Sequence, residues 1–262
     1  MEAISGISPV IVHERLIYRT RLGRPINDAE QQSAEPTTAA EFHQLGRAMF
    51  HEGEFEKAAR LFDRGLREDP AALFMNFDRA QCAMALGRHD DAIQSFTACV
   101  ALNPGPVIFA RRAEALAARA TSHERRIAGS IAGWCEVLAD RAAARADYLA
   151  ALRRSDNKLA EAWFGLGLLD ARQRKFGAAE QNFVKALQTG HPEAPVRVNL
   201  AIVQAETGRL SAAIGNARRA VALRPNDAEA KALLDKLEKE SIPNRRPLTG
   251  TISAIKQWET IQ

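Results

Sequence analysis

A period of 34 residues runs through the middle of the chain and restricts its fold more than any other feature. The positions that recur 34 residues later are Ala58 (as Ala92), Phe62 (as Phe96), Pro70 (as Pro104), Leu166 (as Leu200) and Ala179 (as Ala213). A fixed period of this length indicates supersecondary units that repeat along the chain. One such unit cannot bury its own apolar face, so neighbouring units are expected to stack.

Each repeat is predicted to be a pair of helices. Alanine is abundant and aromatic residues are only 6% of the chain, which favours close-packed helices over a sheet. Glycines such as Gly53 and Gly87 mark the turns, and prolines such as Pro70 end the second helices. We expect small residues of the two helices to face each other, as Gly46 and Ala58 do. The larger Phe62, Phe96, Tyr148 and Phe183 would then fill the space toward the next unit.

Two repeats carry a more detailed motif: Trp163, Leu166, Gly167, Ala179 and Phe183 with Pro192, and Phe42, Leu45, Gly46, Ala58, Phe62 and Pro70. In this motif the chain resembles the tetratricopeptide-repeat (TPR) family over roughly residues 39–240. The resemblance implies an all-α fold, a right-handed α-solenoid of about five TPR helix hairpins with a C-terminal capping helix. It also implies a protein that binds other polypeptides.

The period divides the chain into three parts. An N-terminal extension and linker covers residues 1–38, the repeats cover 39–241, and a tail covers 242–262. The five expected units are 39–72, 73–106, 107–159, 160–193 and 194–227, and a capping helix is expected over 228–241. Apolar residues also occur outside the repeats, from Ile4 to Leu22 and at Ile252, Ile255 and Trp258.

The third unit is longer than the others, because Phe96 and Tyr148 are separated by one period plus eighteen residues. Eighteen residues make about five helical turns, so the insertion around 123–140 can lengthen both helices without rotating their buried faces. In the favoured interpretation a long hairpin turns near Gly129 and Ser130. In the alternative, a capping box at Thr121 and Glu124 starts a separate helix.

The tip of this hairpin would carry three apolar side chains, Ile127, Ile131 and Trp134, which are costly to leave in water. We expect a partner protein or a second copy of the chain to cover them, in preference to the chain's own terminal segments.

Motifs of known chemistry are absent from the sequence. The histidines show no ligand spacing with Cys82, Cys99 or Cys135, and there is no phosphate-binding glycine loop or nucleophile elbow. The sequence therefore predicts a non-catalytic protein without a cofactor or a bound metal. The odd number of cysteines, and the lack of a signal peptide or an apolar run that spans a membrane, favour a cytoplasmic location.

In the family that the chain resembles, the first helix of each unit lines a concave groove that holds a peptide. The groove residues that the resemblance implies here are His43, Arg47, Phe74, Phe77, Asp78, Arg111, Arg112, Phe164, Arg172 and Asn199. Phenylalanine beside arginine is a composition typical of binding hot spots, although Phe77 and Phe164 would equally suit packing between helices.

These observations predict a scaffold or adaptor whose groove binds an acidic or amphipathic polypeptide. Two alternatives stay open. Nine arginines and no lysine lie between Arg111 and Arg154, together with five acids, so the third unit would bind nucleic acid if this charge is exposed. The chain would otherwise be a non-catalytic subunit that positions a separate enzyme.

Overall fold

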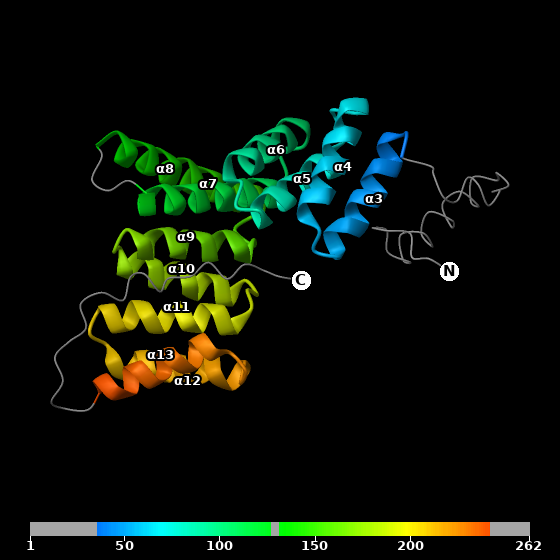
Figure 1. Cartoon of the computed structure of the whole chain (residues 1–262). Helices are drawn as coiled ribbons and strands as arrows, with labels where there is room; N and C mark the ends of the chain where they lie inside the picture. The colour runs from blue at the N-terminus through cyan, green and yellow to red at the C-terminus, as the bar shows by residue number, and fades with distance from the viewer. Residues whose placement is uncertain (1–35, 127–130, 242–262) are drawn as a thin grey trace, which may run out of the picture. The chain divides into compact units, whose positions relative to one another are not determined.

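The computed structural model describes residues 36–126 and 131–241, and every regular element within these ranges is an α-helix (Figure 1). The prediction of an all-α fold is therefore confirmed. The calls on residues 1–35 and on the tail 242–262, with the apolar residues in both, lie outside the described residues.

The chain divides into two units, Met1–Asn103 and Pro104–Gln262. The described helices of the first unit are α3 (Ala39–His51), α4 (Phe55–Glu68), α5 (Leu73–Ala85) and α6 (His89–Leu102). Those of the second are α7 (Pro106–Arg126), α8 (Ile131–Arg154), α9 (Ala160–Arg172), α10 (Phe176–Gln188), α11 (Glu193–Glu206), α12 (Leu210–Leu223) and α13 (Ala228–Glu240).

Successive helices pair into antiparallel hairpins, two in the first unit and three in the second among the described residues. Hairpins then stack on the next one along the chain, since α4 packs on α5, α8 on α9 and α10 on α11. The last helix, α13, packs on α12 and buries Leu237 and Ala230, while its other face carries lysines and glutamates. This arrangement seals the end of the stacked hairpins.

Aromatic side chains fill space both inside the hairpins and between them. The ring of Phe62 lies against Gly46, and that of Phe183 against Gly167, each within one hairpin. A Cβ atom at either glycine would overlap the ring, so the glycine exists to admit the aromatic residue. Phe62 also shares a buried cluster with Met75 of the next hairpin, and Phe183 shares one with Val196, in agreement with the prediction that these aromatic residues fill the space toward the next unit. The prediction also holds for Tyr148, whose ring lies against Gly165 of the next hairpin.

The third hairpin is the long one. Helices α7 and α8 have 21 and 24 residues, against 13 in α9 and in α10. Eight extra residues in α7 relative to α9 extend it by about 12 Å. Thr121 lies inside α7, where its hydroxyl donates to the Ala117 carbonyl at 2.9 Å. The alternative of a separate helix capped at Thr121 is therefore wrong.

Cross-helix ion pairs hold α7 against α8. Arg112 donates to both oxygens of Asp147 at 2.7 and 2.8 Å, and Arg119 to both oxygens of Asp140 at 2.9 and 2.6 Å. A third bond joins Arg141 to Glu124 at 2.5 Å. Asp140, Arg141 and Asp147 are buried, so each charge needs the partner that it has. Asp170 on α9 accepts hydrogen bonds from Arg145 and from Asn182, which connects α8, α9 and α10.

Candidate functional site

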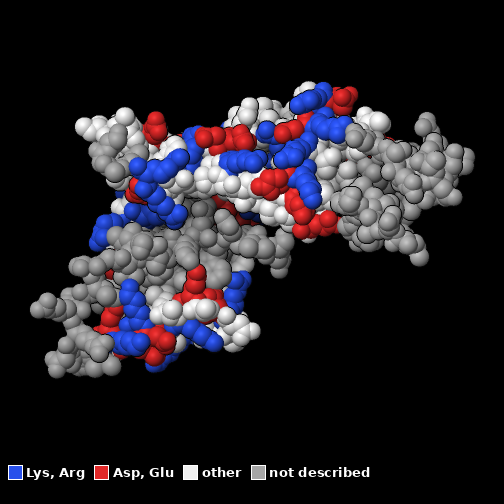
Figure 2. Space-filling model, in the orientation of Figure 1, with Lys and Arg blue, Asp and Glu red and all other residues white. Residues whose placement is uncertain are grey.

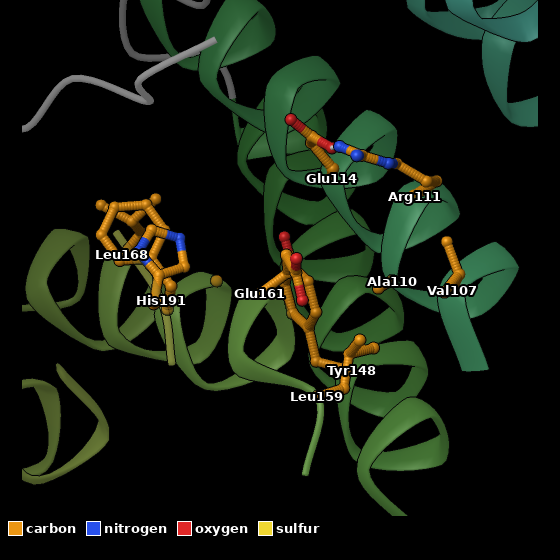
Figure 3. A pocket seen from close by; sticks show the side chains of 11 residues that line it. Val107, Ala110, Arg111, Glu114, Tyr148, Leu159, Glu161, Leu168 and His191 are labelled. Atoms are coloured by element: carbon orange, nitrogen blue, oxygen red, sulfur yellow. Dashed lines mark hydrogen bonds and ion pairs between the residues drawn. The ribbon is translucent and has the colours of Figure 1, made fainter. Parts of the chain in front are cut away.

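A cavity of about 110 Å³ lies in the second unit (Figure 3). Its lining comes from α7, α8, α9 and the segments that precede α9 and α11: Val107, Ala110, Arg111, Glu114, Tyr148, Leu159, Glu161, Phe164, Gly165, Leu168 and His191. Sites for small molecules measure roughly 300–1,000 Å³, so this cavity is too small for most of them. Its size suits a single side chain.

Tyr148 is the aromatic wall of this cavity. Its ring reaches across from α8 to the backbone of α9 at Gly165, where any larger residue would collide with it. Burial raises the pKa of Tyr148 well above its usual range, and the nearby carboxylate of Glu114 adds to this effect. The hydroxyl therefore stays neutral and is available as a hydrogen-bond donor or acceptor.

His191 closes the opposite end of the cavity beside Leu168, as Figure 3 shows. Its ring stacks on Phe164 with the centroids 4.2 Å apart and an angle of 20° between the planes. Burial lowers the pKa of His191, which favours the neutral ring. In the tautomer that the geometry favours, Nδ1 donates to the Pro192 carbonyl at 3.2 Å, and Nε2 remains an acceptor.

The charges at the rim do not favour an anion. Arg111 is paired with Glu114, since Nη1 lies 3.0 Å from Oε2, and Figure 3 shows the two side chains directed toward each other. Glu161 is exposed and pairs with none of the described cations. The rim therefore has one carboxylate in excess, which would repel an acidic segment and attract a basic one.

Of the predicted groove residues in the second unit, only Arg111 and Phe164 line the cavity. Arg112 is bonded to Asp147, as described above. Asn199 is only 2% exposed, and its side chain donates to the Pro195 carbonyl of its own helix at 2.9 Å. Arg172 is partly buried on α9, and burial lowers its pKa, an effect that Glu124 partly offsets.

Three of the predicted residues in the first unit come together. Nε2 of His43 lies 2.8 Å from Oδ2 of Asp78, and Nε of Arg47 lies 3.9 Å from the same oxygen. Phe77 packs against Phe96 with the ring centroids 5.5 Å apart, so it contributes to the hairpin. Phe74 is 74% exposed and takes no part in this packing.

The predicted contact at the tip of the hairpin is described only in part. Ile127 lies outside the described residues. Ile131 is 83% exposed and Trp134 is 40% exposed, so within the described chain neither is well covered.

The arginines of the third unit are largely paired. Five of the nine contact a carboxylate: Arg111, Arg112, Arg119, Arg141 and Arg145. Arg154 donates to the Pro104 carbonyl and lies over the Phe109 ring. Basic and acidic side chains also lie among one another on the face that Figure 2 shows. Five of the nine arginines are thus engaged by carboxylates, four of them within the hairpin, which weakens the nucleic-acid alternative.

Sequence reasoning missed Glu114, Leu159, Tyr148 and His191 as members of the site. The family motif gave no signal for them, because they come from the lengthened hairpin and from loops before a helix. Tyr148 was identified as a large packing residue, and the cavity beside it depends on Gly165, one helix further along the chain.

Comparison with known proteins gives a consistent picture. A tetratricopeptide-repeat family model matches residues 43–105 and 169–228. The protein TTC0263 from Thermus thermophilus, described as a thermophilic TPR protein, is 21% identical, with 77% of this chain and 99% of that chain covered and a TM-score of 0.61. No curated protein sequence matches the chain.

Two further solved structures share the fold. PilW, described as a type IV pilus biogenesis factor, is 18% identical, covers 83% of this chain and 97% of its own, and gives a TM-score of 0.60. YrrB, described as a TPR protein with an unusual peptide-binding site, is 15% identical. Its alignment covers 77% of this chain and 92% of YrrB, with a TM-score of 0.52.

None of the described helices has the length and apolarity that a membrane crossing requires. The glycine–aromatic packing within the hairpins, the helix order and these matches agree, and the chain is a tetratricopeptide-repeat protein.

Proposed function

We propose that this protein is a non-catalytic adaptor that holds an amphipathic polypeptide segment against α7 and α9. The observation that carries the proposal is the cavity beside Tyr148, which has the volume for one side chain and lies on the first helices of two successive hairpins. TPR proteins bind other proteins or peptides, and the family is generally non-catalytic. A cytoplasmic location remains part of this proposal.

The chemistry of the cavity favours an amphipathic segment over an acidic one. Phe164, Leu168 and Tyr148 offer apolar surface to an apolar or aromatic side chain, whose burial contributes about 1.5–3 kcal/mol. Glu161 has no described cation as a partner, so it is placed to accept a lysine or arginine next to that anchor in the peptide. His191 Nε2 adds an acceptor for a peptide N–H.

Selection from a random peptide library, followed by fluorescence anisotropy with the selected peptides, tests this proposal. We expect the selected sequences to contain an apolar or aromatic residue beside a basic one. The variant Val107→Lys puts a positive charge at the rim, which would repel the basic residue of the peptide, and should weaken binding about tenfold or more. The control is Val184→Lys, because Val184 on α10 is 39% exposed, Val107 is 48% exposed, and Val184 does not line the cavity.

Two results would contradict the proposal. One is the selection of acidic peptides, which would favour the acidic partner that the sequence also allowed. The other is equal binding to Val107→Lys and Val184→Lys, which would place the peptide elsewhere.

A further inference from the structure

Arg125, Arg141 and Arg172 form an arginine cluster where α7 and α9 end. Arg141 of α8 is buried and donates to Glu124 of α7 at 2.5 Å. Burial lowers the pKa of Arg172, the last residue of α9. The nearby charges of Arg141 and Arg125 lower this pKa further, whereas Glu124 has the opposite effect. The four side chains are therefore close together, and three positive charges meet one negative charge. Figure 2 shows Lys and Arg side chains gathered at this end of α7.

Two members of the cluster lie on the helix faces that line the cavity beside Tyr148. Arg125 comes eleven residues after Glu114 on α7, and both helices run in the same direction because α8 is antiparallel to each. Arg172 has the same spacing from Glu161 on α9. Eleven residues make about three helical turns, so each arginine shares a face with a glutamate of the cavity. Each helix therefore presents a glutamate at the cavity and an arginine about 16 Å further along.

The helix dipole alone does not explain this arrangement. Arginines in the last turn of a helix interact favourably with its dipole, and Arg126 can do so as well as Arg125. Arg126 lies two turns after Arg119, on the face of α7 that turns to α8. Arg125 and Arg172 instead lie on the cavity's side and repel each other there. The positive charge is thus concentrated at one end of the surface that the cavity occupies.

We propose that the arginine cluster binds an acidic side chain of the same peptide whose apolar residue enters the cavity. This inference rests on the proposed function and adds a charge pattern to it, with a basic residue of the peptide at Glu161 and an acidic one at Arg172. A guanidinium can form two parallel hydrogen bonds with a carboxylate, which would also offset the repulsion within the cluster. A distance of about 16 Å corresponds to about five residues of an extended peptide. The two charged residues of the peptide should therefore be about five positions apart.

A set of synthetic peptides tests this charge pattern. Each consists of serine and alanine with one tryptophan, a lysine next to it, and a single glutamate on the other side of the tryptophan. The position of the glutamate changes by one residue from peptide to peptide. Fluorescence anisotropy gives the Kd of each for the full chain. We expect the tightest binding with the glutamate about five residues from the lysine, about tenfold tighter than with glutamine in its place.

Charge reversal on α7 locates the contact. Arg125→Glu should weaken binding of the tightest peptide about tenfold. Arg126→Glu is the matched control, because Arg126 is exposed on the same turn and its replacement changes the net charge equally. It should change the affinity less than about twofold. Neither variant should affect the peptide with glutamine, since that peptide has no carboxylate for the cluster. Circular dichroism checks that both variants keep their helices.

The proposed function and this inference fail in different ways. If none of the peptides binds, or if Val107→Lys leaves their binding unchanged, the cavity is not the site and both proposals are overturned. If Val107→Lys weakens binding but the position of the glutamate has no effect, only the role of the arginine cluster is overturned. The same conclusion follows if Arg125→Glu and Arg126→Glu bind the tightest peptide equally.

Discussion

Arg174 adopts a left-handed backbone conformation, with φ of 58°, in the turn between α9 and α10. The corresponding turns between α3 and α4, α5 and α6, and α11 and α12 contain Gly53, Gly87 and Gly208, with φ of 77°, 69° and 75°. This conformation costs a residue with a Cβ atom about 1–2 kcal/mol. Arg174 recovers part of that cost through a contact with the Phe176 ring at 5.3 Å.

Replacing Arg174 with glycine should therefore stabilise the protein by about 0.5 kcal/mol, because the relieved strain exceeds the lost ring contact and the added freedom of the unfolded chain. The measurement is the free energy of unfolding in urea. Gly87→Ala is the matched control, and it should destabilise the chain by about 1 kcal/mol. If Arg174→Gly lowers stability instead, the contacts of the arginine matter more than its backbone strain.

At the scale of the element, the long hairpin depends on ion pairs that the sequence did not identify as structural. Arg112 was predicted to be a groove residue, but its guanidinium is bonded to Asp147, a side chain only 9% exposed. Arg112→Glu would bring two carboxylates together in this place and should destabilise the protein by about 3–5 kcal/mol. Arg111→Glu is the control, because the pair with Glu114 is nearer the surface and is expected to contribute at most about 1 kcal/mol.

Thermal unfolding of the two variants measures this difference. Equal melting temperatures for Arg111→Glu and Arg112→Glu would mean that the bond to Asp147 contributes nothing to the hairpin.

The same hairpin shows how far the sequence predicts the structure. Helix pairs were predictable because they follow local signals, such as Gly53 and Gly87 at the turns and the 34-residue spacing of Phe62 and Phe96. The direction of an arginine was not predictable, because Arg111 and Arg112 are neighbours, yet Arg111 pairs with Glu114 of its own helix whereas Arg112 reaches Asp147 across the hairpin. The cavity was not predictable for the same reason, since it depends on Tyr148 and Gly165 meeting across two hairpins.

For the whole molecule, the division into two units separates the proposed binding site from part of the chain. All of the residues that line the cavity lie in the second unit, Pro104–Gln262, which has its own buried core around Phe183, Val196 and Leu200. His43, Arg47 and Asp78 belong to the first unit and form their own ion pairs there. The proposed peptide site therefore does not require the residues predicted in the first unit.

A fragment of residues 104–262 should consequently bind the peptides selected with the full chain, with an affinity within about threefold of the parent, a difference of less than about 0.7 kcal/mol. Circular dichroism should show the fragment to be helical, which establishes that it folds before its binding is interpreted. Fluorescence anisotropy measures the affinity, and the fragment that carries Val107→Lys serves as the weak-binding control. A folded fragment that binds tenfold or more weakly than the parent would show that the first unit supplies part of the peptide site, and His43, Arg47 and Phe74 would then be the residues to replace next.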